Sequence, residues 1–256
     1  MTASLDKFQK IEIVQRKDHA PDLWTIRVRP EQPLAFQPGQ YATLAWRDGG
    51  HLVERPYSIV SSPLEPEIEF FFELVPHGGL TPVLRKMDVG DNLLIRRETK
   101  GRFTFDKTSG HVNHFLAATV TGVAPFVSMV RTLAHEAREG RPSNYHVVVL
   151  HAASRSWEFA YREELEALAK NSKWFKYVPT ISRPWEDAAW KGEVGRIEDI
   201  LRKYLDSYGL EPSNTTTYLC GQPQMVENSR EILQRRGFQK EFVRQEIYWV
   251  PKKAAK

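Results

Sequence analysis

The stretch FLAATVTGVAPFVSMV, residues 115–130, decides the fold of the second half of this 256-residue chain. It begins as a short apolar run typical of a buried strand, passes through a tight turn containing Gly122, and continues with helical spacing after Pro125. Strand, tight turn and helix in this order are typical of a parallel sheet that holds a dinucleotide pyrophosphate. The stretch lacks the G-x-G-x-x-G fingerprint, so an ordinary strand-to-helix loop is the alternative.

Downstream of this stretch, strands and helices alternate. We expect strands at residues 145–152, 174–182, 215–221 and 241–250, and helices at 125–140, 157–171, 196–209 and 223–237. Such alternation implies right-handed crossovers and a parallel sheet covered on both faces. We therefore predict an α/β Rossmann-like domain over residues 109–256, with its ligand at the carboxyl ends of the strands.

Upstream, the pattern is that of short strands separated by Pro and Gly. We expect strands at residues 8–15, 23–30, 40–46, 51–60, 67–75 and 91–98, and one short helix at 80–87. Many short strands in about a hundred residues are typical of a small antiparallel barrel or sandwich. The sequence therefore predicts a first domain over residues 1–108, built as an antiparallel β-barrel.

Composition excludes several classes of protein. With 41% hydrophobic and 27% charged residues the chain is typical of a folded globular protein, and a net charge of +4 is too mild to indicate nucleic-acid binding. We expect no membrane insertion and a cytoplasmic location, because no apolar run approaches the roughly 20 residues of a membrane span and the N-terminus lacks a signal peptide. A single cysteine supplies neither a disulfide nor an iron-sulfur or zinc-thiolate site, so we expect no metal.

Two motifs in the first half have the chemistry of anion binding. In RPYS, residues 55–58, Arg55 and Tyr57 share one face of a strand. They are either an exposed pair before a turn, or an arginine on a phosphate with a tyrosine ring on a planar ligand. In HGGLTP, residues 77–82, Gly79 precedes an expected helix with Thr81 as N-cap, which suits a phosphate cradle but also a plain hairpin loop.

Serine-arginine pairs follow two expected strands of the second half. Ser154 and Arg155 come after one strand, and Ser182 and Arg183 after the next. Hydroxyls and guanidiniums are what a ribose 2'-phosphate needs, and no acidic residue stands at either strand end. Together they favour NADP over NAD.

The only cysteine, Cys220, stands in TYLCGQPQMV, residues 217–226. A free cysteine is usually a small core residue. Cys220, however, ends an expected parallel strand, where ligands bind, and the following Gly221 permits close approach of a flat ring. A role in a ligand pocket is therefore the competing interpretation.

These motifs occur in one order, from residue 8 to about 250, that resembles the ferredoxin-NADP reductase family, particularly its bacterial branch. The resemblance rests on FQPGQY, RPYSIVSS, EFFFELVPHGGLTPVLRKMDVGD, TGVAPFVSM, LHAASRSWEFAYREEL, PTISR, GRI, YLCGQPQMV and EIYWVPK. It implies two cofactors, FAD on the barrel and NADP on the parallel sheet, and hydride transfer between them with the protein aligning the two rings. It also implies a C-terminal tail that covers the flavin.

The resemblance further implies a role for each matching residue. FAD would be bound by Arg55, Pro56, Tyr57, Ser58, Leu74, Val75, Gly79, Leu80, Thr81, Tyr248 and Trp249. NADP would be bound by Thr121, Gly122, Pro125, Arg155, Ser182, Arg183, Arg196 and Gly221. Ser58, Cys220 and Glu246 would be the catalytic residues. One departure stands out, because the family's T-G-T-G is T-V-T-G here, so that Val120 replaces a glycine.

The expected function is electron transfer between NADP(H) and a one-electron carrier, an acidic ferredoxin or flavodoxin. The alternatives are a standalone reductase component for an oxygenase, a reductase of free flavins, and a non-catalytic flavin-binding redox sensor. An intact Ser58, Cys220 and Glu246 set argues against the sensor. The sequence does not distinguish a monomer from a dimer.

Overall fold

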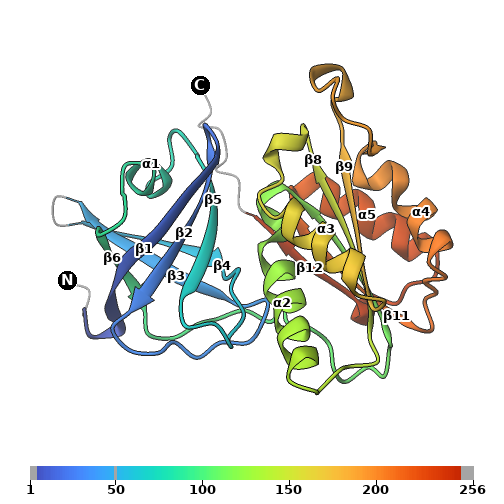
Figure 1. Ribbon diagram of the computed structural model, residues 1–256, viewed down its shortest axis with the longest axis horizontal. Helices are drawn as coiled ribbons and strands as arrows, with labels where there is room; N and C mark the ends of the chain where they lie inside the picture. The colour runs from blue at the N-terminus through green and yellow to red at the C-terminus, as the bar shows by residue number, and fades with distance from the viewer. Residues whose placement is uncertain (1–4, 49–50, 249–256) are drawn as a thin grey trace. The chain divides into compact units, whose positions relative to one another are not determined.

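The computed structural model describes residues 5–48 and 51–248, and its chain divides into two compact units (Figure 1). The first unit consists of residues 1–105 together with 124–143, and the second of residues 106–123 together with 144–256. Each unit has its own six-stranded sheet.

The first unit is an antiparallel barrel, as predicted. Its strands are β1 (Phe8–Ala20), β2 (Leu23–Pro30), β3 (Tyr41–Asp48), β4 (His51–Ser58), β5 (Ile68–Glu73) and β6 (Asn92–Arg96). The strand order is β4-β3-β6-β1-β2-β5, and every pair is antiparallel. The two edges meet just beyond β4, where Ile59 bridges to Phe70 and the Val60 N–H donates to the Glu69 carbonyl at 2.9 Å. This contact closes the sheet on itself.

Alternating side chains fill the barrel, because successive residues of a strand point to opposite faces. Ile11, Ile13, Trp24, Phe70 and Phe72 are all nearly or fully buried in one core. The short helix α1 (Thr81–Leu84) adds its own apolar residues to this core. It is shorter than the sequence suggested, because the chain after it continues in turns that bond residue i to i+3.

The second unit has the predicted parallel sheet. Its strands are β7 (Asn113–Thr119), β8 (His146–Ala153), β9 (Phe175–Ile181), β10 (Glu193–Val194), β11 (Thr215–Gly221) and β12 (Val243–Ile247). The order is β10-β9-β8-β7-β11-β12, and every pair is parallel. The chain leaves β7 toward β8 on one side and returns to it through β11 on the other. Parallel sheets bind ligands at such a switch point, beyond the carboxyl ends of the strands.

Helices connect these strands. α3 (Arg162–Asn171) lies against β9, while α4 (Ile197–Ser207) and α5 (Pro223–Arg235) pack together over the sheet (Figure 1). Phe115, Ala117 and Leu219 of the sheet share one core with Leu201 and Val226 of these two helices. The opposite face of the sheet is more polar, since it carries His114, His151 and Tyr218, all completely buried.

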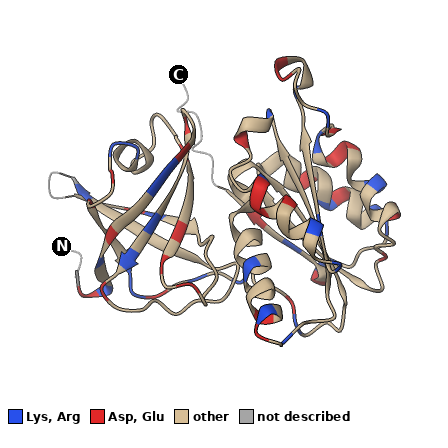
Figure 2. Ribbon diagram, in the orientation of Figure 1, with Lys and Arg blue, Asp and Glu red and all other residues tan. Residues whose placement is uncertain are grey.

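The remaining helix, α2 (Ala124–Arg138), follows β7 in the chain but belongs to the first unit. Single turns of 3-10 helix occur at Leu5–Lys7, Val120–Val123, Ser156–Glu158, Pro184–Glu186 and Lys240–Phe242. Among the described residues, none of the helices has the length and apolar character that crossing a membrane requires. Basic and acidic residues are interspersed along the chain in both units (Figure 2).

Candidate functional site

Arg55 and Gly79, two predicted anion-binding residues of the first unit, lie together. A Cβ placed on Gly79 would be 3.3 Å from a terminal nitrogen of the Arg55 guanidinium and 3.1 Å from a methyl carbon of Val53. The glycine therefore leaves an open backbone beside an exposed cation, which Arg55 of β4 provides. This arrangement fits the charge and close approach of a pyrophosphate.

Strand β4 continues after Arg55 with Pro56 and ends with Tyr57 and Ser58. The Tyr57 ring meets the Phe72 ring edge to face at a centroid distance of 4.8 Å, and burial raises the pKa of its phenol far above the usual value. Ser58 is 7% exposed and pairs with Tyr41 of β3. The Tyr57 ring is therefore held in place by Phe72 and uncharged, and it offers a flat surface.

The predicted N-cap role of Thr81 is wrong. Leu80 occupies the cap position, and no side chain caps the helix. The Thr81 hydroxyl instead accepts from the Val75 N–H at 3.0 Å and lies 3.3 Å from the Val75 carbonyl. It thereby closes the loop that contains Gly79, and it holds Val75 at the loop's start. Leu74 is anchored by its N–H to the Asp22 carbonyl at 2.8 Å.

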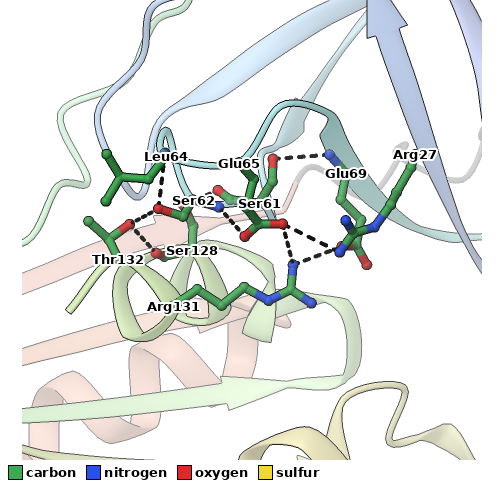
Figure 3. Close-up of polar contacts among 9 residues, drawn as sticks. All are labelled: Arg27, Ser61, Ser62, Leu64, Glu65, Glu69, Ser128, Arg131 and Thr132. Atoms are coloured by element: carbon green, nitrogen blue, oxygen red, sulfur yellow. Dashed lines mark hydrogen bonds and ion pairs between the residues drawn. The ribbon is translucent and has the colours of Figure 1, made fainter. Parts of the chain in front are cut away.

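The segment after Ser58 is bonded to helix α2 through hydroxyl groups (Figure 3). Ser128 donates to the Ser61 carbonyl at 2.7 Å, and Thr132 donates to the Ser62 hydroxyl at 2.9 Å. All four side chains are buried. The start of α2, which includes Pro125, is therefore part of the same rigid body as the Tyr57–Ser58 edge.

A network of two arginines and two glutamates lies beside these hydroxyls (Figure 3). Glu69 of β5 accepts from Arg27 of β2 at 2.8 Å and from Arg131 of α2 at 2.7 Å. Glu65 is within 3.4 Å of Arg27 and 3.7 Å of Arg131. The Glu69 side chain is only 6% exposed and that of Arg131 12%. The network therefore fastens α2 to the barrel.

In the second unit, the turn after β7 lies directly on the end of β11. A Cβ on Gly122 would be 2.4 Å from the Cys220 carbonyl oxygen, and one on Gly221, whose φ is +129°, would be 2.2 Å from the Thr119 hydroxyl. Thr119 in turn accepts from the Gln222 N–H at 2.9 Å. Only glycine fits at either position, so two bare backbone segments meet at the switch point of the sheet.

Val120, where a glycine was expected, has a left-handed backbone with φ +41°. This conformation is strained for a β-branched residue. The Val120 carbonyl bonds to Nε2 of the completely buried His151 at 2.9 Å, while Nδ1 of this histidine lies 3.1 Å from the Tyr177 hydroxyl. Burial lowers the pKa of His151 to about 4, so the ring is neutral and donates from Nε2. The Val120 side chain packs on Phe159 and its neighbours.

Three predicted residues lie side by side at the end of β11 and β12. Cys220 pairs in register with Glu246, and Tyr248 donates from its hydroxyl to the Thr121 carbonyl at 3.0 Å and from its N–H to the Gly221 carbonyl at 3.2 Å. The Cys220 thiol is completely buried, and burial together with the nearby Glu246 carboxylate raises its pKa well above the usual value. Cys220 is therefore a neutral thiol. Trp249 lies outside the described residues.

The two serine-arginine pairs end neighbouring strands in register. Ala153 of β8 pairs with Ile181 of β9, and the Arg183 N–H donates to the Ser154 carbonyl at 3.1 Å. Arg196 reaches the same edge, because the adjacent Gly195 N–H donates to the Ile181 carbonyl at 2.9 Å.

Two acids lie at this edge, although neither strand ends in one. Arg155 donates to Glu186 at 2.6 Å and to Glu158 at 3.1 Å, and Glu186 also lies 3.6 Å from Arg183. Both glutamates come a few residues after the strand ends, so strand position alone did not reveal them.

Sequence reasoning also missed two exposed tryptophans at this edge. Trp157 is 49% and Trp185 75% exposed, and the Arg155 guanidinium lies 5.7 Å from the centre of the Trp157 ring. The signal was present as a short repeat, since SRSW (154–157) and SRPW (182–185) follow neighbouring strands. Flat aromatic surfaces beside guanidiniums suit a purine that carries a phosphate.

The second unit thus carries the features of a dinucleotide-binding reductase, and comparison with known proteins agrees. Residues 116–231 match the oxidoreductase NAD-binding domain family. The chain is 30% identical over 242 residues to ferredoxin–NADP reductase A of Sorangium cellulosum, covering 89% of this chain and 84% of the relative. It therefore belongs to the ferredoxin–NADP reductase family.

Two further relatives show how broad this similarity is. A crystal structure of a ferredoxin NADP+ reductase from Neisseria gonorrhoeae with bound FAD and NADP is 25% identical and superposes with a TM-score of 0.82, covering 94% of this chain and 98% of that one. The electron transfer component of xylene/toluene monooxygenase from Pseudomonas putida is 28% identical, covering 90% of this chain but 63% of the relative.

Proposed function

We propose that this chain is a flavoprotein oxidoreductase that transfers electrons between NADP(H) and a one-electron carrier. The observation that supports this most strongly is the meeting of Gly122 with Cys220 and Gly221 at the switch point of the parallel sheet, where a side chain at either glycine would collide with backbone or hydroxyl atoms. Bare backbone at this place suits close approach of a dinucleotide. Membership of the ferredoxin–NADP reductase family supports the same function.

FAD would be held by the first domain, residues 1–108, and would supply the ring that accepts a hydride and releases electrons one at a time. The exposed Arg55 guanidinium would neutralise its pyrophosphate above the bare backbone of Gly79. The braced ring of Tyr57 would provide a flat surface for the flavin. Leu74, Val75, Leu80 and Thr81 would shape the loop, and Tyr248 and Trp249 would contribute from the tail.

NADP(H) would be held by the second domain, residues 109–256. Thr121, Gly122 and Gly221 would offer backbone to the pyrophosphate and nicotinamide, and Pro125 would start the helix behind them. At the other end of the same edge, Ser182 and Arg183, with Arg155 and Arg196, would bind the 2'-phosphate.

Ser58, Cys220 and Glu246 would position the reacting rings. Because the Cys220 thiol keeps its proton, this residue orients a ring by contact and does not attack it as a thiolate. The Glu246 carboxylate, in register with Cys220, would provide a negative charge next to a nicotinamide that becomes positive on giving up a hydride. Cys220→Ser should therefore slow hydride transfer and leave FAD bound.

The carrier would be an acidic ferredoxin or flavodoxin, and the enzyme a cytoplasmic NADPH-preferring ferredoxin–NADP reductase. A second candidate is a standalone reductase for an oxygenase, which the similarity to the xylene/toluene monooxygenase component favours. The two functions differ in the carrier, not in the hydride step.

The deciding experiment adds NADPH anaerobically to the purified yellow protein. Bleaching of the flavin is the expected result, and persistent colour would contradict the proposed function. A parallel assay of NADPH and NADH oxidation with ferredoxin, flavodoxin and free FMN as acceptors then separates the carriers. Rapid turnover with FMN alone would indicate a free-flavin reductase.

A further inference from the structure

One carboxylate lies between the two arginines that would bind a 2'-phosphate. Glu186, at the end of the turn Pro184–Glu186, contacts Arg155 through Oε2 at 2.6 Å and Arg183 through Oε1 at 3.6 Å. Each of its oxygens therefore faces a different guanidinium. Two terminal oxygens of a bound phosphate would have to make the same contacts with Arg155 and Arg183.

The charges of Arg155 and Arg183 are also balanced without a ligand. Arg155 is bonded to Glu158 at 3.1 Å as well as to Glu186, so two guanidiniums face two carboxylates. A 2'-phosphate carries close to two negative charges, and it gains most from cations whose charge is not already neutralised. Binding it between Arg155 and Arg183 therefore requires a carboxylate to leave.

Glu186 is the carboxylate that can leave. The second oxygen of Glu158 accepts from the Ser154 N–H at 2.8 Å, and its side chain is 14% exposed, so this residue is fixed at the end of β8. The Glu186 side chain is 34% exposed, and its carboxylate contacts the two arginines. Rotation of this one side chain would remove the Glu186 contact from both guanidiniums, leaving Arg183 without a carboxylate and Arg155 with Glu158 alone.

We propose that Glu186 is a built-in competitor of the 2'-phosphate and limits the preference of this chain for NADPH over NADH. The inference rests on the proposed function, since it assumes that Arg155 and Arg183 face the adenosine end of the dinucleotide. A nucleotide with a free 2'-hydroxyl leaves the Glu186 contacts in place, whereas a 2'-phosphate must break them. Removing the Glu186 charge therefore strengthens binding of the phosphorylated form only.

The test uses Glu186→Gln, which keeps the size of the side chain and removes its charge. The flavin-loaded protein is titrated by calorimetry with 2',5'-ADP and, separately, with 5'-AMP, which differs only in lacking the 2'-phosphate. We expect 2',5'-ADP to bind about tenfold more tightly to Glu186→Gln than to the wild type, a gain of roughly 1.4 kcal/mol. Binding of 5'-AMP should change less than about twofold, and the gain for 2',5'-ADP should shrink at high salt.

Glu166→Gln is the matched control, because Glu166 forms an exposed ion pair with Arg162 in the same unit. It should leave both affinities unchanged. Unchanged or weaker binding of 2',5'-ADP to Glu186→Gln, with the wild type binding normally, would overturn this inference and leave the proposed function intact. Failure of both nucleotides to bind any of the three proteins would overturn the proposed function and this inference together.

Discussion

The molecule contains two charge networks of the same composition and opposite character. In the first unit, Arg27 and Arg131 meet Glu65 and Glu69, with the glutamate and Arg131 side chains 12% exposed or less. In the second unit, Arg155 and Arg183 meet Glu158 and Glu186, with both arginines and Glu186 at least 28% exposed.

Burial gives the two networks different tasks. A buried ion pair costs desolvation that is recovered only while every partner is present, so its loss destabilises the fold. An exposed pair contributes little to stability, and its groups can exchange partners with a ligand. The first network therefore fastens α2 to the barrel, and the second remains available for binding. Mutations at four positions, Glu69, His151, Arg183 and Val120, would break or sharpen this comparison.

The largest effect is expected for Glu69→Ala. This change removes the buried carboxylate that lies nearest to both Arg27 and Arg131 and leaves them only the more distant Glu65, and should lower the free energy of unfolding by roughly 3 to 5 kcal/mol. Urea denaturation followed by circular dichroism measures it. Glu67→Ala is the control, because its partner Arg29 is 61% exposed, and should cost less than about 1 kcal/mol. Equal losses would remove the distinction between the networks.

The second prediction concerns the pH dependence of stability. It extends the contrast to another buried polar contact, that of His151 with the Val120 carbonyl. His151 has its pKa lowered by burial to about 4, whereas an unfolded histidine titrates near 6.5, so the unfolded state binds more protons between these values. The contribution of neutral His151 to stability is thus complete above about pH 6.5 and is lost as the pH falls toward 4.

His151→Gln tests this directly, since glutamine can still donate to the Val120 carbonyl but does not titrate. Between pH 7 and pH 4.5 the wild type should lose roughly 2 to 3 kcal/mol more stability than the variant. His114, whose pKa burial also lowers to about 4, is present in both proteins, so its contribution cancels. Parallel pH profiles for the two proteins would show that His151 is not held neutral.

The third prediction concerns the exposed network. Arg183→Ala should raise the KM for NADPH about tenfold, which corresponds to roughly 1.4 kcal/mol, and the KM for NADH less than about twofold. Its free energy of unfolding should stay within about 0.5 kcal/mol of the wild type, because the Arg183 side chain is 48% exposed. Equal effects on the two nucleotides would contradict the 2'-phosphate assignment. A large loss of stability would instead make this network structural.

The sequence predicted the elements well because their patterns are local. Strand β2 and strand β11 have the bounds that alternation and apolar runs indicated, and the two sheet types followed from the order of elements. What sequence could not predict was pairing at a distance. Glu69 and Arg131 are 62 residues apart, and nothing in either neighbourhood indicates the other. In the sequence alone Glu186 resembles an ordinary surface residue. Its contact with Arg155 depends on the register of β8 and β9, which the sequence does not show.

Val120 is the departure that the sequence did reveal, and replacing it by glycine should have only a small net effect on stability. Its left-handed φ costs a β-branched residue roughly 1 to 2 kcal/mol, whereas glycine adopts this conformation freely. Glycine, however, loses the apolar contact with Phe159 and is more flexible when unfolded. Val120→Gly should therefore stay within about 1 kcal/mol of the wild type.

Val120→Ala separates the two opposing contributions. Alanine also loses the contact with Phe159, but it keeps the strained left-handed backbone, so it should be less stable than the glycine variant by about 1 kcal/mol. Thermal unfolding of the three proteins side by side measures this order. If the alanine variant proved the more stable of the two, the backbone of this turn would not be strained. The hydrogen bond from His151 to the Val120 carbonyl would then not be holding residue 120 in a strained conformation.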